Sequence, residues 1–197
     1  MTKDTLYPTD LIQLNREQQA VSIHLINTEA LEAFLLNRSV QQRAALEAQK
    51  FSGDAGTYAI LTEGDSWSVV AGVADPHALT PWCLAKLAEN LPQGTYRLAA
   101  GEPGAAMLGW ITAQYRFDRY LSSPKPDAPR VLLSGEPKAI PAVLAQARAT
   151  ALVRDMVNTP AEDMGRAQIE AQAEALVKAH SGAQLRVTRG DQLARGF

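Results

Sequence analysis

The sequence has few of the residues from which catalytic and metal sites are commonly built. It holds one cysteine, Cys83, and three histidines, His24, His77 and His180, among 197 residues. A single cysteine excludes an internal disulfide and a zinc site made of cysteines. The histidines lie far apart with no paired spacing, so they predict no histidine metal centre.

The sequence also lacks long apolar runs and a strong excess of either charge. No apolar stretch approaches the roughly 18 residues of a membrane-spanning helix, and the polar first ten residues do not resemble a secretory signal. We therefore expect a cytoplasmic protein with no membrane partner. Lys and Arg number 19 against 21 Asp and Glu. The basic stretches 115–120 and 185–195 are diluted by other residues, so no nucleic-acid partner is indicated.

What is present is the composition of a globular chain, with 46% hydrophobic and 20% charged residues. Segments with strand and helix patterns alternate, which predicts an α/β fold with a mixed sheet flanked by helices. We expect strands at 21–26, 57–62, 67–71, 95–99, 130–133 and 184–188, and helices at 28–36, 39–50, 80–91, 104–115, 139–157, 166–180 and 191–197.

Several local signals set the boundaries of these segments. Ser39 and Gln42 have capping-box spacing, and Thr80 before a proline predicts a helix N-cap. The short connection between 57–62 and 67–71 predicts an antiparallel hairpin. Ser122–Pro129 holds three prolines in eight residues and is expected to be an exposed connection.

One helix face and the end of the chain carry further expectations. Gly104, Leu108, Ile111 and Tyr115 should line one face of their helix. The last helix–strand–helix, over 166–197, resembles the opening of a second sheet, which makes the chain a fragment of a larger protein.

The three histidines are the usual candidates for acid–base chemistry. His24 lies within a strand, where a structural side chain is the favoured interpretation. His77 follows Asp75-Pro76 and is expected to be solvated, and His180 ends a helix, where a cation favours the helix dipole. None of them has a neighbour spaced to orient it, so we predict that none is catalytic.

Three other features suggest chemistry, and each has a simpler interpretation. Cys83 would be a nucleophile if a helix N-terminus lowered its pKa, but a small buried apolar residue is favoured. Gly101–Gly104 opens a helix and is suited to an anion, but it lacks the lysine of a phosphate loop. Glu162 and Asp163 suggest a metal pair, but a solvated Glu162 and an Asp163 that caps the helix near Arg166 are favoured.

Two stretches, Gly109–Tyr120 and Ala151–Gly165, resemble the leucyl aminopeptidase (cytosol aminopeptidase) family of two-metal metallopeptidases. The second is similar to the junction at which the family's linker helix enters its catalytic domain. Two departures are Glu162, where many relatives have Asn, and Arg166, where many have Pro.

The family's metal ligands, catalytic lysine, catalytic arginine and acidic signature lie downstream of this junction, beyond Phe197. Asn158–Glu162 superficially matches that signature, but Pro160 stands where the ligating Asp is required. The resemblance therefore assigns no catalytic, cofactor-binding or metal-ligating residue to this chain.

The resemblance implies a macro-like N-terminal α/β domain over 1–137, a linker helix over 138–157 and the incomplete start of a peptidase domain over 158–197. The full-length enzyme would use two divalent metal ions, zinc or manganese, to hydrolyse peptide substrates from their N-termini. It would form a homo-hexamer, and this chain alone would be inactive.

Two alternatives stay open at this point. One is a stand-alone macro-like module that binds a nucleotide or an ADP-ribose type of ligand at the strand ends, with Gly101–Gly104 as its support. The other is a purely structural or interaction domain.

Overall fold

The computed structural model describes residues 10–123 and 129–196. The chain divides into two compact units, Met1–Ala151 and Leu152–Phe197, here named the sheet unit and the terminal unit. The strands are β1 (Ile12–Leu14), β2 (Val21–Ile26), β3 (Tyr58–Glu63), β4 (Ser66–Gly72), β5 (Gly94–Leu98) and β6 (Arg130–Ser134). The helices are α1 (Leu31–Leu36), α2 (Val40–Ala48), α3 (Ala85–Asn90), α4 (Ala106–Ala113), α5 (Ala139–Asn158), α6 (Arg166–Ala179), the 3₁₀ helix η1 (Gly190–Gln192) and α7 (Leu193–Gly196).

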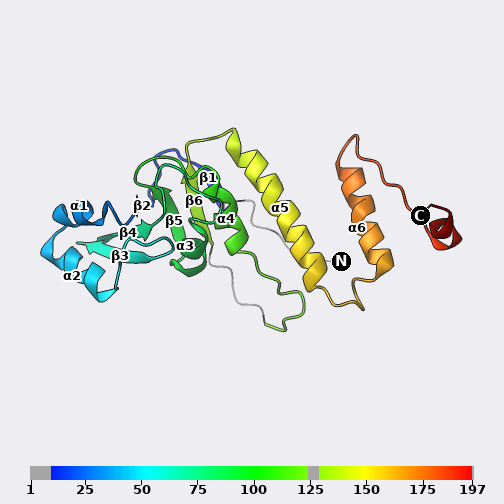
Figure 1. Cartoon of the computed structure of the whole chain (residues 1–197), viewed down its shortest axis with the longest axis horizontal. Coiled ribbons are helices and arrows are strands. Elements are labelled where there is room, and N and C mark those ends of the chain that lie inside the picture. The colour runs from blue at the N-terminus through cyan, green and yellow to red at the C-terminus, as the bar shows by residue number, and fades with distance from the viewer. Residues whose placement is uncertain (1–9, 124–128, 197) are drawn as a thin grey trace. The chain divides into compact units, whose positions relative to one another are not determined.

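The sheet unit is built on one six-stranded sheet with the order β1-β6-β5-β2-β4-β3 (Figure 1). Its neighbouring strands are parallel except for β3 and β4, which are antiparallel. The predicted α/β fold with a mixed sheet and flanking helices is therefore confirmed. The hairpin is confirmed too, since Glu63 pairs with Ser66 and Gly64 has a φ of 56° in the turn.

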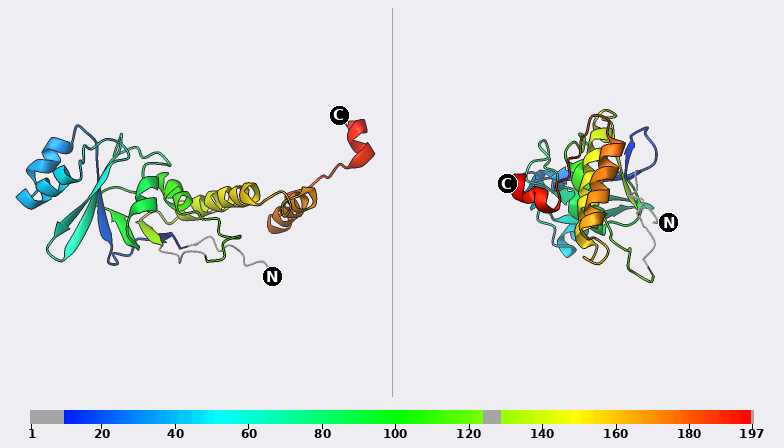
Figure 2. Two further views of the ribbon diagram at one scale, coloured as in Figure 1. Left: turned by 90° about the horizontal axis from the view of Figure 1, so that it is seen from below. Right: turned by 90° about the vertical axis from the view of Figure 1, so that its right-hand side faces the viewer.

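Helices cover both faces of this sheet, as the burial of neighbouring strand residues shows. Val69 and Val70 are adjacent in β4 and fully buried, yet they belong to two different apolar clusters, because successive strand side chains point to opposite faces. Val70 packs in the cluster that includes α1 and α2, and Val69 in the cluster of α3, α4 and the first part of α5. Figure 2 shows these two sets of helices on opposite sides of the strands.

Tyr96 of β5 lies at the centre of the larger cluster. Its ring contacts those of Trp67 and Trp110, with centroid distances of 6.0 and 5.6 Å. The Tyr96 hydroxyl donates to the Pro92 carbonyl at 2.5 Å. Burial raises the pKa of Tyr96 to about 12, so the hydroxyl stays protonated and keeps this bond in alkaline solution in which an exposed tyrosine would ionise.

The capping box on α2 forms as predicted. The Ser39 hydroxyl accepts from the Gln42 amide at 3.1 Å, and the Gln42 side chain accepts from the Ser39 amide at 3.2 Å. The N-cap expected at Thr80 is wrong, because residues 81–84 form a turn and α3 begins only at Ala85. The turn is fixed by tertiary packing, since the backbone of Pro81 lies directly against Gly109 of α4.

The face expected for the helix over 104–115 is also corrected. Gly104 and Tyr115 lie outside α4, and Leu108 is only partly buried. Buried residues occupy most of the α4 surface, because the helix packs between the sheet and its neighbours. They are Ala106, Met107, Gly109, Trp110, Ile111 and Thr112.

The terminal unit has no core of its own among its described helices. No residue of α6 is buried, and its apolar residues Ile169 and Leu176 are 48% and 46% exposed. The strand expected over 184–188 is not formed, since residues 183–189 have no regular structure. A strand needs a neighbour to satisfy its backbone groups, and this segment has no such pairing.

Two further observations complete the fold. Most of the expected connection Ser122–Pro129 lies outside the described residues, and Ser122 and Ser123 are exposed. Within the described chain, no helix has both the length and the apolar character needed to cross a bilayer.

Candidate functional site

The loops that follow β5 and β6 form the candidate site that the fold offers. Parallel neighbouring strands end at the same edge of a sheet, and ligands of open α/β folds bind at that edge. The loop after β5 contains Gly101–Gly104, and the loop after β6 contains Gly135 and Glu136. Sequence reasoning therefore placed the glycine loop at the expected edge.

The carboxylate of Glu102 ties these two loops together. It accepts from the Gly135 amide at 2.8 Å and from the hydroxyl of the buried Ser134 at 3.2 Å. A Cβ on residue 135 would lie 2.5 Å from a Glu102 carboxylate oxygen, so any other residue there would require the Glu102 side chain to move. The donors that an anionic ligand would use here are already bonded to a carboxylate of the chain itself.

The start of α4 is closed to an anion in a similar way. The amides of Ala106, Met107 and Leu108 donate to the carbonyls three residues earlier, at 2.9, 3.3 and 3.2 Å. A helix N-terminus binds phosphate through free amides, and these three are used by the turn itself. Together with the negative charge of Glu102, this geometry disfavours a nucleotide or ADP-ribose ligand at Gly101–Gly104.

His24 packs as a structural side chain against α1, on the face of the sheet that α1 and α2 cover. Its ring lies 6.0 Å from that of Phe34, and the Arg38 guanidinium lies 4.2 Å from the centre of the same Phe34 ring. Burial, and secondly the charge of Arg38, lower the pKa of His24 from its ordinary value of 6.5. The folded chain therefore favours the neutral imidazole.

This lowered pKa predicts a loss of stability in acid. Because the unfolded chain binds a proton at His24 more readily, the free energy of unfolding should fall as the pH drops below 6.5 and should be fully retained above it. Urea unfolding at about pH 7 and pH 5 measures this difference. His24→Gln should reduce the difference, and the exposed control His77→Gln should leave it unchanged. An equal pH dependence in wild type and His24→Gln would contradict the prediction.

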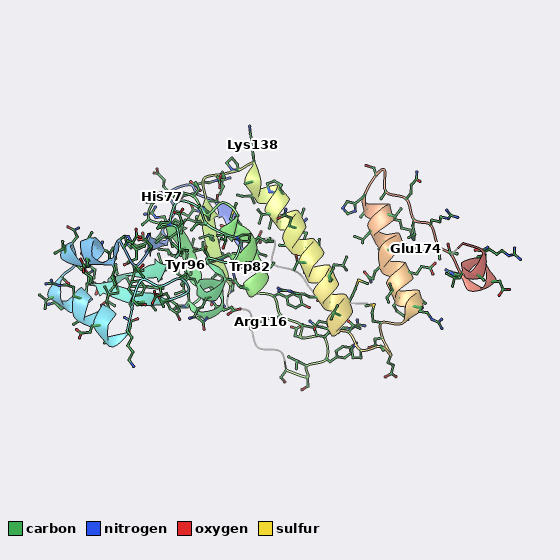
Figure 3. All side chains as sticks on the ribbon, viewed as in Figure 1. His77, Trp82, Tyr96, Arg116, Lys138 and Glu174 are labelled. Atoms are coloured by element: carbon green, nitrogen blue, oxygen red, sulfur yellow. The ribbon has the colours of Figure 1, made fainter. Side chains whose placement is uncertain are left out.

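Each of the other candidates for nucleophilic or acid–base chemistry lies in a residue that makes a local hydrogen bond. The Cys83 thiol accepts from the Thr80 amide at 3.3 Å, and Cys83 is partly buried against the larger cluster, in the turn before α3 rather than within it. His77 is exposed, and its amide donates to the Asp75 carboxylate at 2.8 Å. His180 follows α6, with its ring Nδ1 2.9 Å from the Leu176 carbonyl oxygen. His77 (labelled in Figure 3) and Cys83 both lie in the connection between β4 and α3, and His180 lies after α6.

The expectation for Asp163 is wrong. The N-cap of α6 is Gly165 and not Asp163, and glycine has no side chain to accept a cap bond. The amides of Asp163 and Met164 both donate to the Pro160 carbonyl at 2.9 Å, which makes residues 160–164 a tight turn that ends before the helix. Glu162 is exposed on this turn, as expected.

The residues described here do not fit a two-metal centre. Across 10–123 and 129–196, no three side chains of His, Cys, Asp or Glu come together as metal ligands. Sequence reasoning missed the contact of Glu102 with Ser134 and Gly135. The sequence pattern that could have indicated this contact is the pair of segments Gly-Glu-Pro-Gly and Ser-Gly-Glu, which stand at the ends of two strands.

The protein is thus an α/β domain in which Glu102 joins the loops at the ends of β5 and β6. Among the described residues, no group of side chains is assembled as a metal centre. The family of M17 aminopeptidase N-terminal domains matches residues 21–133, more than half of the chain. The chain therefore belongs to the M17 aminopeptidase family, and residues 21–133 match that family's N-terminal domain.

Solved structures agree with this assignment at the level of the fold. The cytosol aminopeptidase of Coxiella burnetii is similar over 86% of this chain, with a TM-score of 0.70 and 22% identity. A mutant of tomato leucine aminopeptidase is similar over 93% of this chain, with a TM-score of 0.64 and 16% identity. The matches span 38% and 45% of those two proteins. The search of curated proteins found no match.

Proposed function

We propose that this chain serves as the N-terminal, non-catalytic part of a leucyl aminopeptidase-like exopeptidase. The family match over residues 21–133 carries the proposal. As part of the proposal, the chain divides into an N-terminal domain over 1–137, a linker helix over 138–157 and the beginning of the catalytic domain over 158–197. The likeness in fold to the solved aminopeptidases extends over more of the chain than the family match does.

The two divalent metal ions, zinc or manganese, belong to the proposed longer enzyme. Their chemistry would be the activation of a water for hydrolysis of the first peptide bond of a peptide substrate. Since the described residues gather no ligand set, the ligands would come from sequence outside this chain. A cytoplasmic location and a homo-hexameric assembly form part of the same proposal.

An antibody against residues 21–133 tests the proposal in the source cells. We expect it to detect a protein clearly larger than the 21.3 kDa of this chain, because the solved relatives are more than twice as long. The immunoprecipitate should hydrolyse leucine p-nitroanilide, and a metal chelator should abolish this activity. A single species of 21.3 kDa without activity would contradict the proposal.

The purified 197-residue chain should have no aminopeptidase activity with added manganese or zinc. The physical reason is that a two-metal site requires several ligands from different elements in one place. Leucine p-nitroanilide turnover is the measurement, and heat-treated chain gives the background. Turnover that a chelator removes would show that the chain builds a metal site by itself.

A further inference from the structure

The outer edge of β3 is occupied by a side chain from α2. β3 ends the sheet, so no strand of the described residues lies along its outer edge. The Ile60 amide donates to the Gln49 side-chain oxygen at 3.0 Å, and the Gln49 side-chain nitrogen donates to the Ile60 carbonyl at 2.9 Å. One carboxamide therefore makes both bonds that an added strand would make to this residue.

The end of α2 holds Gln49 in place for this contact. The amide of Phe51 donates to the Leu46 carbonyl at 3.0 Å, and that of Lys50 to the Glu47 carbonyl at 2.9 Å, with Lys50 at a φ of 53°. This is the Schellman pattern of helix termination. Phe51 and Leu46 are buried in the same cluster as Ala59 and Leu61 of β3, which fixes the helix end against the strand.

The same arrangement occurs a second time, inside the sheet. Gln114 follows α4 as Gln49 follows α2, and its carboxamide bonds the amide and the carbonyl of Arg130, both at 2.9 Å. Arg130 opens β6, and the β1 ladder begins only at Leu132. At Arg130, Gln114 thus makes the two backbone hydrogen bonds that β1 would make if its pairing with β6 reached that residue. Each glutamine also donates to the carbonyl four residues earlier, at 3.1 and 3.2 Å.

The part of β3 that Gln49 contacts has a sequence that would pair with a copy of itself. Residues 58–62, Tyr-Ala-Ile-Leu-Thr, contain no charge, no proline and no glycine, and the one charge of β3, Glu63, lies at its end beside the hairpin turn. Natural edge strands are usually protected by charges or proline along their length. Uncharged segments of high β-propensity associate readily through exposed edges. Two identical edges pair antiparallel about a two-fold axis, which makes such a contact self-complementary.

We propose that Gln49 is a one-residue substitute for a neighbouring strand, and that it prevents a second copy of this chain from pairing at the β3 edge. Backbone groups alternate in direction along a strand. Since Ile60 points its amide and carbonyl outward to Gln49, Tyr58 and Thr62 point theirs outward as well. Gln49 occupies the middle one of these three positions, so an incoming strand would have to displace it.

The test compares the full chain with Gln49→Ala in sedimentation velocity over a range of concentrations. We expect Gln49→Ala to dimerise at a concentration at least tenfold below that of wild type. At low concentration the Ile60 amide should exchange its hydrogen roughly tenfold faster, because it has lost its bond. Gln41→Ala, an exposed change on the same helix, should behave as wild type.

Two measurements assign the association to the β3 edge. In Gln49→Ala at high concentration, the amides of Tyr58 and Thr62 should become protected from exchange. Adding Thr62→Pro removes an outward donor from an edge strand and should restore the wild-type behaviour. Equal association of Gln49→Ala and wild type would overturn the proposal. Association that leaves Tyr58 and Thr62 unprotected would also overturn it, whether or not Thr62→Pro folds.

Discussion

Replacing Trp110 with alanine is expected to lower the free energy of unfolding by about 3–5 kcal/mol. Trp110 is fully buried at the centre of the larger cluster, beside Tyr96. Its indole nitrogen donates to the Arg130 carbonyl at 2.7 Å, so the change removes both packing and a buried bond. Domains of this size are stable by about 5–15 kcal/mol, so the loss is a large part of the total.

Urea unfolding followed by far-UV circular dichroism measures this loss without relying on tryptophan fluorescence. The matched control is Trp82→Ala, since Trp82 is 59% exposed and should change stability by less than about 0.5 kcal/mol. Trp110→Phe should lie between them, because the Arg130 carbonyl keeps its bond from Gln114. Equal stabilities of Trp110→Ala and Trp82→Ala would show that the cluster does not support the sheet unit.

Replacing Gly109 with alanine is expected to destabilise the chain strongly, although alanine normally favours a helix interior over glycine by up to about 1 kcal/mol. A Cβ at residue 109 would lie 2.0 Å from the Pro81 carbonyl oxygen and 3.2 Å from Trp82 Cα. Both are backbone atoms, so no side chain can rotate away. Overpacking of this kind costs on the order of 3 kcal/mol or prevents folding.

Gly94→Ala is the control for this second variant. The added Cβ at residue 94 would meet the Tyr96 side chain at 3.7 Å, which is an ordinary contact. Thermal unfolding should therefore show a midpoint near that of wild type for Gly94→Ala and a much lower one for Gly109→Ala. An unchanged midpoint for Gly109→Ala would mean that the turn at 81–84 is free to move away from α4.

Elements with strong local signals were predictable from the sequence. The strand over 21–26 and the capping box at Ser39 depend on short-range patterns, and both are present. The start of α3 was not predictable in this way, because it depends on the packing of Pro81 against Gly109, far along the chain. The strand expected at 184–188 had the right local pattern but forms no pairing in the described chain.

The sequence did not predict β1. It is three residues long and too short for an alternating pattern to be recognised. At the candidate site, the position of Gly101–Gly104 at the strand ends was predictable. The closure of that loop by Glu102 was not, since it depends on Ser134 and Gly135 from another part of the sequence.

The pairing of β1 with β6 has a consequence for synthesis on the ribosome. Ile12 pairs with Leu132, so β1 is made about 120 residues before the strand that it pairs with. At the usual elongation rates of about 5–20 residues per second, Leu11 and Ile12 wait on the order of ten seconds for β6 to be made. During that interval the nascent chain presents two apolar side chains that are buried in the finished domain. Leu11 and Ile12 can therefore be buried as they are in the finished sheet only after β6 has been made.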